Sequence, residues 1–201
     1  PKRSDEEPGE FLVAARVAGD HGSPIWKPMR FYHNTVILPD STWRGYYAAG
    51  LSGSMRGTTR RVFNNIFVHT AGMPAFNFLR VEGDFAADGN LHWSQTEGPT
   101  FTGDFLAQAR RARPRQVDWF ALSQTTYSGG WTARDQFADP QFTALTADWH
   151  IPANLRLREG SPAVDAGVDL PAEWPDPLRE ADAGPPDIGA VPLGAPAATI
   201  G

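Results

Sequence analysis

The chain contains no cysteine and only two lysines, Lys2 and Lys27, among its 201 residues. The lack of cysteine excludes disulfide bonds and metal sites built on thiolates. No apolar run approaches the ~20 residues that a membrane-spanning helix needs. The net charge of −5 and the pI near 5.5 are unlike the strongly basic domains that bind nucleic acid. These absences predict a single globular domain that engages neither membranes nor nucleic acid.

What the chain does contain is a short pattern that recurs. Phe31–Ile37 aligns with Val62–Val68, which places Asn34 and Asn65 at equivalent positions 31 residues apart. Each copy is only about seven residues long, too short for a helical repeat, and carries the β-branched and aromatic residues that strands favour. The pattern therefore predicts one strand region for each turn of a stacked parallel coil.

A looser third copy, Asp88–Trp93, places Asn90 25 residues after Asn65. Asn tolerates the left-handed backbone conformation that a bend in each turn needs. Its amide can also hydrogen-bond the equivalent Asn of the next turn, because it carries both donors and an acceptor. We therefore predict a ladder of Asn side chains that fixes the register of the turns.

The alternation of side chains along these segments predicts an inside and an outside for the coil. The residues expected inside are Phe31 with Val62 and Val36 with Phe67, and those expected to point outward or into a corner are Tyr32, Thr35, Phe63 and Ile66.

Three motifs in the second half strengthen this interpretation. They are Asp139-Pro-Gln-Phe142, Leu155 to Gly167 with its Gly-Ser-Pro-Ala-Val-Asp-Ala-Gly turn, and Asp187-Ile-Gly-Ala-Val191. Together with the Asn-containing copies, the chain from about 30 to 192 resembles right-handed parallel β-helix proteins of the pectate lyase-like superfamily. The resemblance implies an all-β, right-handed parallel β-helix (solenoid) formed by C-terminal rungs, one short helix and a loop-rich C-terminal cap. That superfamily contains lyases, hydrolases, epimerases and non-catalytic binders, so the fold does not fix the activity.

The expected organisation is one domain preceded by a flexible segment, residues 1–10. Residues 11–100 are predicted to form rungs with a long inserted loop at 39–60, and residues 101–201 to hold the helix, the last rungs and the closing segment. The helix is expected between Thr102 or Asp104 and Pro114. Nothing before Phe11 could cover the open edge of the first rung, so we expect an N-terminal portion of the β-helix, as a separate or cleaved chain, to pack there.

The acidic residues of the closing segment are predicted to be structural. Asp165, Asp182 and Asp187 lie in turn sequences, where Asp side chains accept hydrogen bonds from nearby backbone amides. Residues 168–186 are expected to run over the surface or to close the open end. A calcium requirement stays open, because oxygen ligands are plentiful but no ligand spacing is diagnostic.

Charge is distributed unevenly along the chain. Residues 11–81 hold eight Lys or Arg and two acids, whereas residues 82–201 hold eight basic residues and seventeen acids. A positive rung region in a chain of net negative charge favours an anionic ligand. Aromatic residues are interleaved with these cations, and sugar rings stack on aromatic faces while Arg pairs with carboxylates. An acidic polysaccharide is the predicted partner, and a secreted or periplasmic location follows from it.

The favoured function is a polysaccharide lyase that cleaves uronate-containing chains by β-elimination. This reaction needs a base for the proton beside the carboxylate and a cation for the enolate-like intermediate. The alternatives are a non-catalytic polysaccharide-binding or structural β-helix, and a glycoside hydrolase, which needs two carboxylates. The predicted catalytic residues are Lys27, His33 and Arg61, and the predicted substrate-binding residues are Arg30, Trp43, Arg44, Tyr46, Tyr47, Arg60 and His69.

Overall fold

A computed structural model describes residues 29–38, 59–70, 84–96, 98, 134–146, 148, 150–182 and 184–196. In these ranges the chain forms three successive pairs of short strands, each pair joined by a two-residue bend. The pairs are β1 (Met29–Tyr32) with β2 (Thr35–Leu38), β3 (Thr59–Phe63) with β4 (Ile66–His69), and β5 (Asp84–Asp88) with β6 (Leu91–Ser94).

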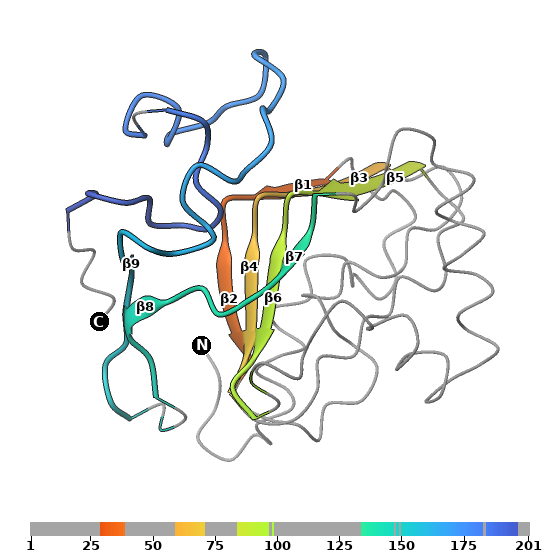
Figure 1. Cartoon of the computed structure of the whole chain (residues 1–201). Helices are drawn as coiled ribbons and strands as arrows, with labels where there is room; N and C mark the ends of the chain where they lie inside the picture. The colour runs from red at the N-terminus through yellow and green to blue at the C-terminus, as the bar shows by residue number, and fades with distance from the viewer. Residues whose placement is uncertain are drawn as a thin grey trace, which may run out of the picture.

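Corresponding strands of the three pairs lie side by side and parallel (Figure 1). One sheet has the order β1-β3-β5, and the other has the order β2-β4-β6 and ends on β7 (Gln136–Phe137). The two sheets meet along the line of bends, so that in Figure 1 one crosses the top and the other runs down from it. A separate antiparallel pair, β8 (Phe142–Ala144) with β9 (Asn154–Leu157), follows. The described part is thus all-β with parallel sheets, as the repeat predicted.

The register of the sheets confirms the predicted Asn ladder. Asn34 Nδ2 donates to Asn65 Oδ1 at 2.9 Å, and Asn65 Nδ2 donates to Asn90 Oδ1 at 2.9 Å. The backbone amides of Asn34 and Asn65 donate to the same two oxygens at 3.0 Å. At the end of the row Asn90 donates its backbone amide to Asp135 Oδ1 at 2.9 Å. The ladder therefore ends on a carboxylate, which the repeat did not predict.

The predicted position of the left-handed residue was wrong by one. The residue before each ladder Asn takes this conformation, with φ of 52° at His33, 54° at Asn64 and 65° at Gly89. This arrangement leaves the following Asn free to extend its amide along the ladder, because the backbone has already turned. The bend and the ladder are thus made by different residues.

Aromatic rings fill the space between the two sheets. Phe31 stacks on Phe67, which stacks on His92, and His92 stacks on Phe137, with ring centroids 5.3 to 6.4 Å apart. Val62 beside them is 1% exposed. The predicted pairings of Phe31 with Val62 and of Val36 with Phe67 are confirmed by the strand register.

The opposite face of the second sheet also is buried. Ile66 points away from the space between the sheets, as expected, yet it is only 1% exposed because the C-terminal segment covers it. Gly189 packs so closely there that a Cβ would lie 2.7 Å from Ile66 Cδ1. The apolar cluster formed in this way comprises Ile66, Val68, Leu91, Phe142, Leu157, Ala163 and Ile188.

Two of the three acidic residues that were predicted to be structural, Asp182 and Asp187, accept backbone amides in turns, whereas Asp165 contributes its backbone amide. Asp187 accepts the backbone amides of Asp165 at 2.7 Å and Leu193 at 2.6 Å, and donates its own amide to Asp182 at 2.6 Å. Within the described ranges no group of three or more His, Asp or Glu residues is placed to hold a metal ion.

Several predicted elements lie outside the described residues. They are the flexible segment 1–10, residues 39–58 of the inserted loop and the helix expected before Pro114. The loop was predicted to end at residue 60, but Thr59 and Arg60 already belong to β3. Among the described residues, none forms a helix with the length and apolar character that crossing a membrane requires.

Candidate functional site

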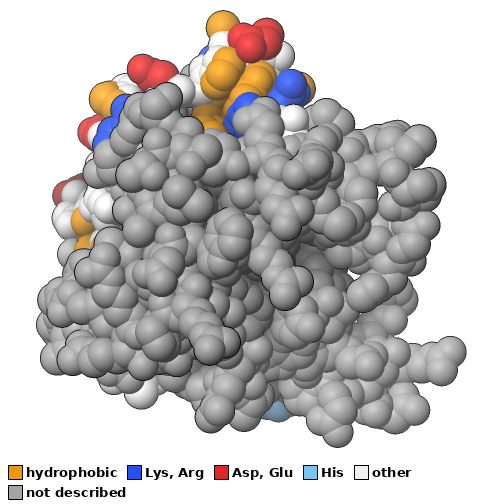
Figure 2. All heavy atoms as spheres, turned by 90° about the vertical axis from the view of Figure 1, so that its right-hand side faces the viewer, with side chains coloured by type: hydrophobic (Ala, Val, Ile, Leu, Met, Phe, Trp, Pro, Cys, Tyr) orange, Lys and Arg blue, Asp and Glu red, His pale blue; other side chains and the backbone are white. Residues whose placement is uncertain are grey.

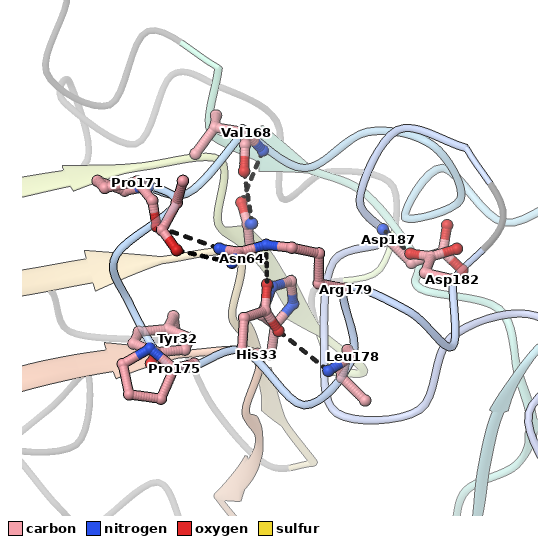
Figure 3. Close-up of polar contacts among 12 residues, drawn as sticks. Tyr32, His33, Asn64, Val168, Pro171, Pro175, Leu178, Arg179, Asp182 and Asp187 are labelled. Atoms are coloured by element: carbon pink, nitrogen blue, oxygen red, sulfur yellow. Dashed lines mark hydrogen bonds and ion pairs between the residues drawn. The ribbon is translucent and has the colours of Figure 1, made fainter.

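The segment 168–182 lies against the corner where the two parallel sheets meet, rather than running freely over the surface (Figure 3). Asn64, at the bend between β3 and β4, donates Nδ2 to the Val168 carbonyl at 2.8 Å and accepts the Val168 amide at 2.7 Å. Farther along, the Tyr32 hydroxyl donates to the Pro175 carbonyl. These contacts join residues more than a hundred positions apart and hold the segment over β1 and β3.

Trp174 is the centre of this contact. It is 8% exposed, and its ring lies 5.7 Å from that of Tyr32 and 5.9 Å from that of Phe63. The Arg30 guanidinium lies 4.9 Å from the centroid of the Trp174 ring, within the range of a cation–π interaction. The indole therefore fixes a positive charge at the outer face of the β1-β3-β5 sheet.

An open hollow of about 450 Å³ lies beside this cation, and we call it the Arg30 hollow. Arg30 itself is exposed and forms no ion pair with a carboxylate of the described residues. In Figure 2 most of the described side chains that face the viewer lie at the upper end of the molecule, and hydrophobic, basic and acidic side chains all occur there. The hollow is lined by Arg30, Phe31, Tyr32, Asn34 and Pro175.

A second space, of about 190 Å³, lies on the other side of the segment, and we call it the His33 cavity. His33 Nε2 is 3.6 Å from Asp176 Oδ2, and both side chains are 6% exposed. Asp176 Oδ1 accepts the Leu178 amide at 3.0 Å, and Arg179 Nε lies 3.9 Å from Asp176 Oδ2. Asp169 and Asp182 also line the cavity, so its wall carries three carboxylates.

Burial sets the protonation of two groups in this wall. Burial lowers the pKa of His33 below its ordinary 6.5, although the charges of Asp176 and Asp182 act in the opposite direction. Burial raises the pKa of Asp182, and the nearby carboxylates of Asp187 and Asp165 raise it further. His33 is therefore neutral at neutral pH, which a general base requires.

The two spaces differ in the ligands they suit. The Arg30 hollow offers a guanidinium that is stacked on Trp174 and has no ion pair with a described carboxylate, and it suits an anionic sugar. The His33 cavity has an acidic wall and one guanidinium, Arg179, whose Nη atoms already donate to the Pro171 and Ala172 carbonyls at 3.1 and 3.0 Å. An anion would be repelled there.

The structure describes the side chains of three of the ten predicted site residues. Arg30 and Arg61 are paired in register on neighbouring strands, so they lie side by side on the sheet. His33 belongs to the separate cavity. Arg60 and His69 lie in β3 and β4, but their side chains are outside the described part. The remaining predicted residues, Lys27, Trp43, Arg44, Tyr46 and Tyr47, also lie outside the described residues.

Sequence reasoning missed the contribution of the segment 168–182. Trp174, Asp176 and Arg179 come from a stretch rich in Pro and acidic residues, which resembled a surface loop. The available signal was a Trp followed directly by Pro and Asp, because a large aromatic residue in a polar stretch needs an apolar surface to cover it.

No family model, curated protein sequence or solved structure matches the chain. The function proposed below is therefore based on the geometry of the described residues.

Proposed function

We propose that the chain is the C-terminal part of a secreted or periplasmic right-handed parallel β-helix protein that binds acidic polysaccharide on the outer face of the β1-β3-β5 sheet. The parallel strand order, repeated in both sheets, and the Asn ladder support the β-helix. Among the described strands, β1 and β2 lie at the ends of their sheets, where a further portion of the β-helix would pack.

The observation that carries the binding function is the position of Arg30 over the Trp174 ring. A guanidinium on an indole keeps its donors directed outward while losing little conformational freedom on binding. Arg61 is its register partner on β3, so two cations follow one another across the strands. Uronate carboxylates could pair with these guanidinium groups, with the sugar ring against Tyr32 and Pro175 in the Arg30 hollow.

Binding of polygalacturonate, alginate and hyaluronan to the full chain, measured by calorimetry, tests this proposal. Arg30→Gln is expected to weaken binding about tenfold, since one charge-assisted contact is lost. Arg158→Gln is the matched control, because Arg158 is exposed and its Nη2 donates to the Thr143 carbonyl on the β8–β9 pair. Absence of binding to every acidic polysaccharide, or equal losses in both variants, would refute the proposal.

A second candidate function, uronate β-elimination, is favoured by the two cations, Arg30 and Arg61, that lie in register on neighbouring strands. In this step the base takes the proton on C5, the C4–O bond breaks, a C4=C5 double bond forms, and the departing oxygen gains a proton. Arg61 would stabilise the enolate-like intermediate and Lys27 would be the base, because His33 lies in the separate cavity, whose acidic wall repels a uronate.

The second candidate is tested by the absorbance of the unsaturated product. Wild-type chain should generate it from a uronate polymer, and Lys27→Gln should abolish it while Arg30→Gln mainly weakens substrate binding. Release of reducing ends without the absorbing double bond would indicate a hydrolase instead. Affinity without any turnover would retain the binding function and reject the lyase.

A further inference from the structure

The His33 cavity contains a buried side chain whose polar atoms are unsatisfied. The His33 side chain is 6% exposed, and neither ring nitrogen has a partner with hydrogen-bond geometry among the described residues, although the backbone at Asp187 and Gly189 lies near enough to raise the pKa of the ring. The nearest carboxylate oxygen, Asp176 Oδ2, is 3.6 Å from Nε2, which is beyond hydrogen-bond distance. Buried polar groups without partners are rare and costly, so an occupant that bonds to this ring would be favoured.

The charges around the ring restrict the chemistry of that occupant. Asp169, Asp176 and Asp182 disfavour an anion, because the Nη atoms of the single guanidinium, Arg179, already bond to backbone carbonyls. A bound metal ion is also disfavoured, because the described residues provide no group of three His, Asp or Glu ligands.

Uncharged hydroxyl groups match the hydrogen-bonding capacity that remains on the His33 ring and on the carboxylates of the cavity. A neutral imidazole offers one donor and one acceptor, and a hydroxyl both donates and accepts. Asp176 Oδ2 and Asp182 Oδ1 accept no backbone amide of the described residues, whereas the second oxygen of each carboxylate does. The volume of about 190 Å³ lies below the ~300 Å³ at which drug-sized pockets begin, so it limits the occupant to about one ring.

We propose that the His33 cavity binds one neutral sugar ring or small polyol, whose hydroxyls bond to the His33 ring and to the carboxylates of Asp176 and Asp182. This site is separate from the Arg30 hollow, and it does not depend on the binding of acidic polysaccharide there. The segment Trp174–Asp176 lies between the two, with Trp174 covering β1 and β3 and Asp176 facing the cavity.

The test uses the full chain with labelled histidine and follows the ring nitrogen signals by NMR at about pH 7.5. Glucose, galactose, mannose, inositol and glycerol are the neutral probes, with galacturonate, acetate and calcium chloride as charged probes. At least one neutral probe should shift the His33 signals saturably, with affinity of about millimolar order for so small a ligand. The His150 signals should not move. If no neutral probe shifts His33, or if only a charged probe does, the proposal is overturned.

Two variants locate the site. His33→Asn keeps a residue that tolerates the left-handed conformation, as Asn64 does at the equivalent bend, and should weaken neutral-probe binding at least tenfold by calorimetry. Asp176→Asn should weaken it severalfold, and His150→Asn, at an exposed position, should have no effect. Unchanged affinity in a folded His33→Asn chain would overturn the proposal even if the wild-type protein binds a sugar.

Discussion

The backbone amides of the turns bond to different side chains in two regions of the molecule. One region is the corner between the two parallel sheets, and the other is the closing segment, residues 161–193. Both contain sharp turns whose backbone amides need acceptors. At the corner the acceptors are the carboxamide oxygens of Asn65 and Asn90, whereas in the closing segment they are the carboxylates of Asp182 and Asp187.

The difference follows from hydrogen-bonding capacity. An amide accepts from one neighbour and donates to the next, so it can be repeated along a row of strands. A carboxylate only accepts hydrogen bonds, so it can bind several backbone amides but cannot donate to the next side chain in a row. Asp135 lies at the end of the Asn ladder but acts as the carboxylates of the closing segment do, because it accepts a hydrogen bond from Asn90 and donates none. Regular repetition thus uses Asn, and termination uses Asp.

The largest expected effect comes from breaking the ladder at its centre. The Asn65 side chain takes part in four hydrogen bonds, to Asn34, Phe31 and Asn90, and is buried. Asn65→Leu should lower the free energy of unfolding by about 4 kcal/mol, since each bond contributes about 1 kcal/mol and partners are left unsatisfied. Urea denaturation measures it. Asn34→Leu, at a half-buried position with fewer partners, should cost clearly less, and equal costs would contradict a ladder with a stronger centre.

Replacing Asp by Asn in each region tests whether the carboxylate is required there. Asp187→Asn should cost about 2 to 3 kcal/mol, because the new NH₂ group would face a backbone amide that now donates to a carboxylate oxygen.

Asp135→Asn is the matched variant at the end of the ladder. Asn would keep the oxygen that accepts from Asn90, and its NH₂ group could donate to His92 Nε2, which lies 3.0 Å from Asp135 Oδ2. We expect a cost of about 1 kcal/mol or less. A larger loss at Asp135 than at Asp187, in urea denaturation, would contradict the distinction between the regions.

An effect smaller than that at Asn65 is expected where the two regions touch. Gly89 has a φ of 65°, and a Cβ there would lie 2.7 Å from Asn64 Oδ1 and 2.8 Å from Val168 Cγ1. Gly89→Ala should therefore cost about 2 kcal/mol or more, from backbone strain and from displacement of Asn64. Gly194→Ala is the control, since Gly194 has a φ of 81° but no atom within 4 Å of a Cβ, and should show the strain alone. Equal losses of thermal stability in Gly89→Ala and Gly194→Ala would mean that Gly89 does not pack closely against Asn64 and Val168.

The smallest expected effect is a dependence on pH at the contact of His33 with the closing segment. Because burial lowers the pKa of His33, its contribution to stability is present above pH 6.5 and is lost as pH falls through the pKa of the folded state.

The measurement is urea denaturation at about pH 7.5 and about pH 5.5. Replacing His33 by Asn should make the free energy of unfolding fall less between these pH values than it does in the wild-type protein. Asp182 has the opposite sign, since its pKa is raised and its contribution is present below 3.8 and lost as pH rises through the pKa of the folded state. An equal fall in wild type and variant would show that His33 is not held neutral by burial.

The strands could be predicted because their signal is local and repeated. The spacings of 31 and 25 residues between ladder positions gave the correct register of both sheets, since one Asn marks the same place in each turn. The structural roles of Asp182 and Asp187 could also be predicted, because an Asp in a turn finds its backbone donors within a few residues.

The site could be predicted only in part, because its contacts are distant in sequence. Arg30 and His33 were identified from charge and from their place beside the repeat, but their partners Trp174 and Asp176 are more than 140 positions away and follow no pattern. Asp135 was missed for a similar reason, since it stands 45 residues after Asn90 and its carboxylate interrupts the Asn series.

The direction of the Asn ladder has a consequence for how such a chain can change its length. Duplicating an interior rung would present the same donors and acceptors to its neighbours on both sides, so the added Asn would join the ladder without a change to the other Asn residues. A rung appended beyond Asp135 would meet a side chain with no N–H to donate, and it would need an Asn at that position first. Evolution can therefore lengthen this protein by copying from its middle, while the carboxylate fixes where the series stops.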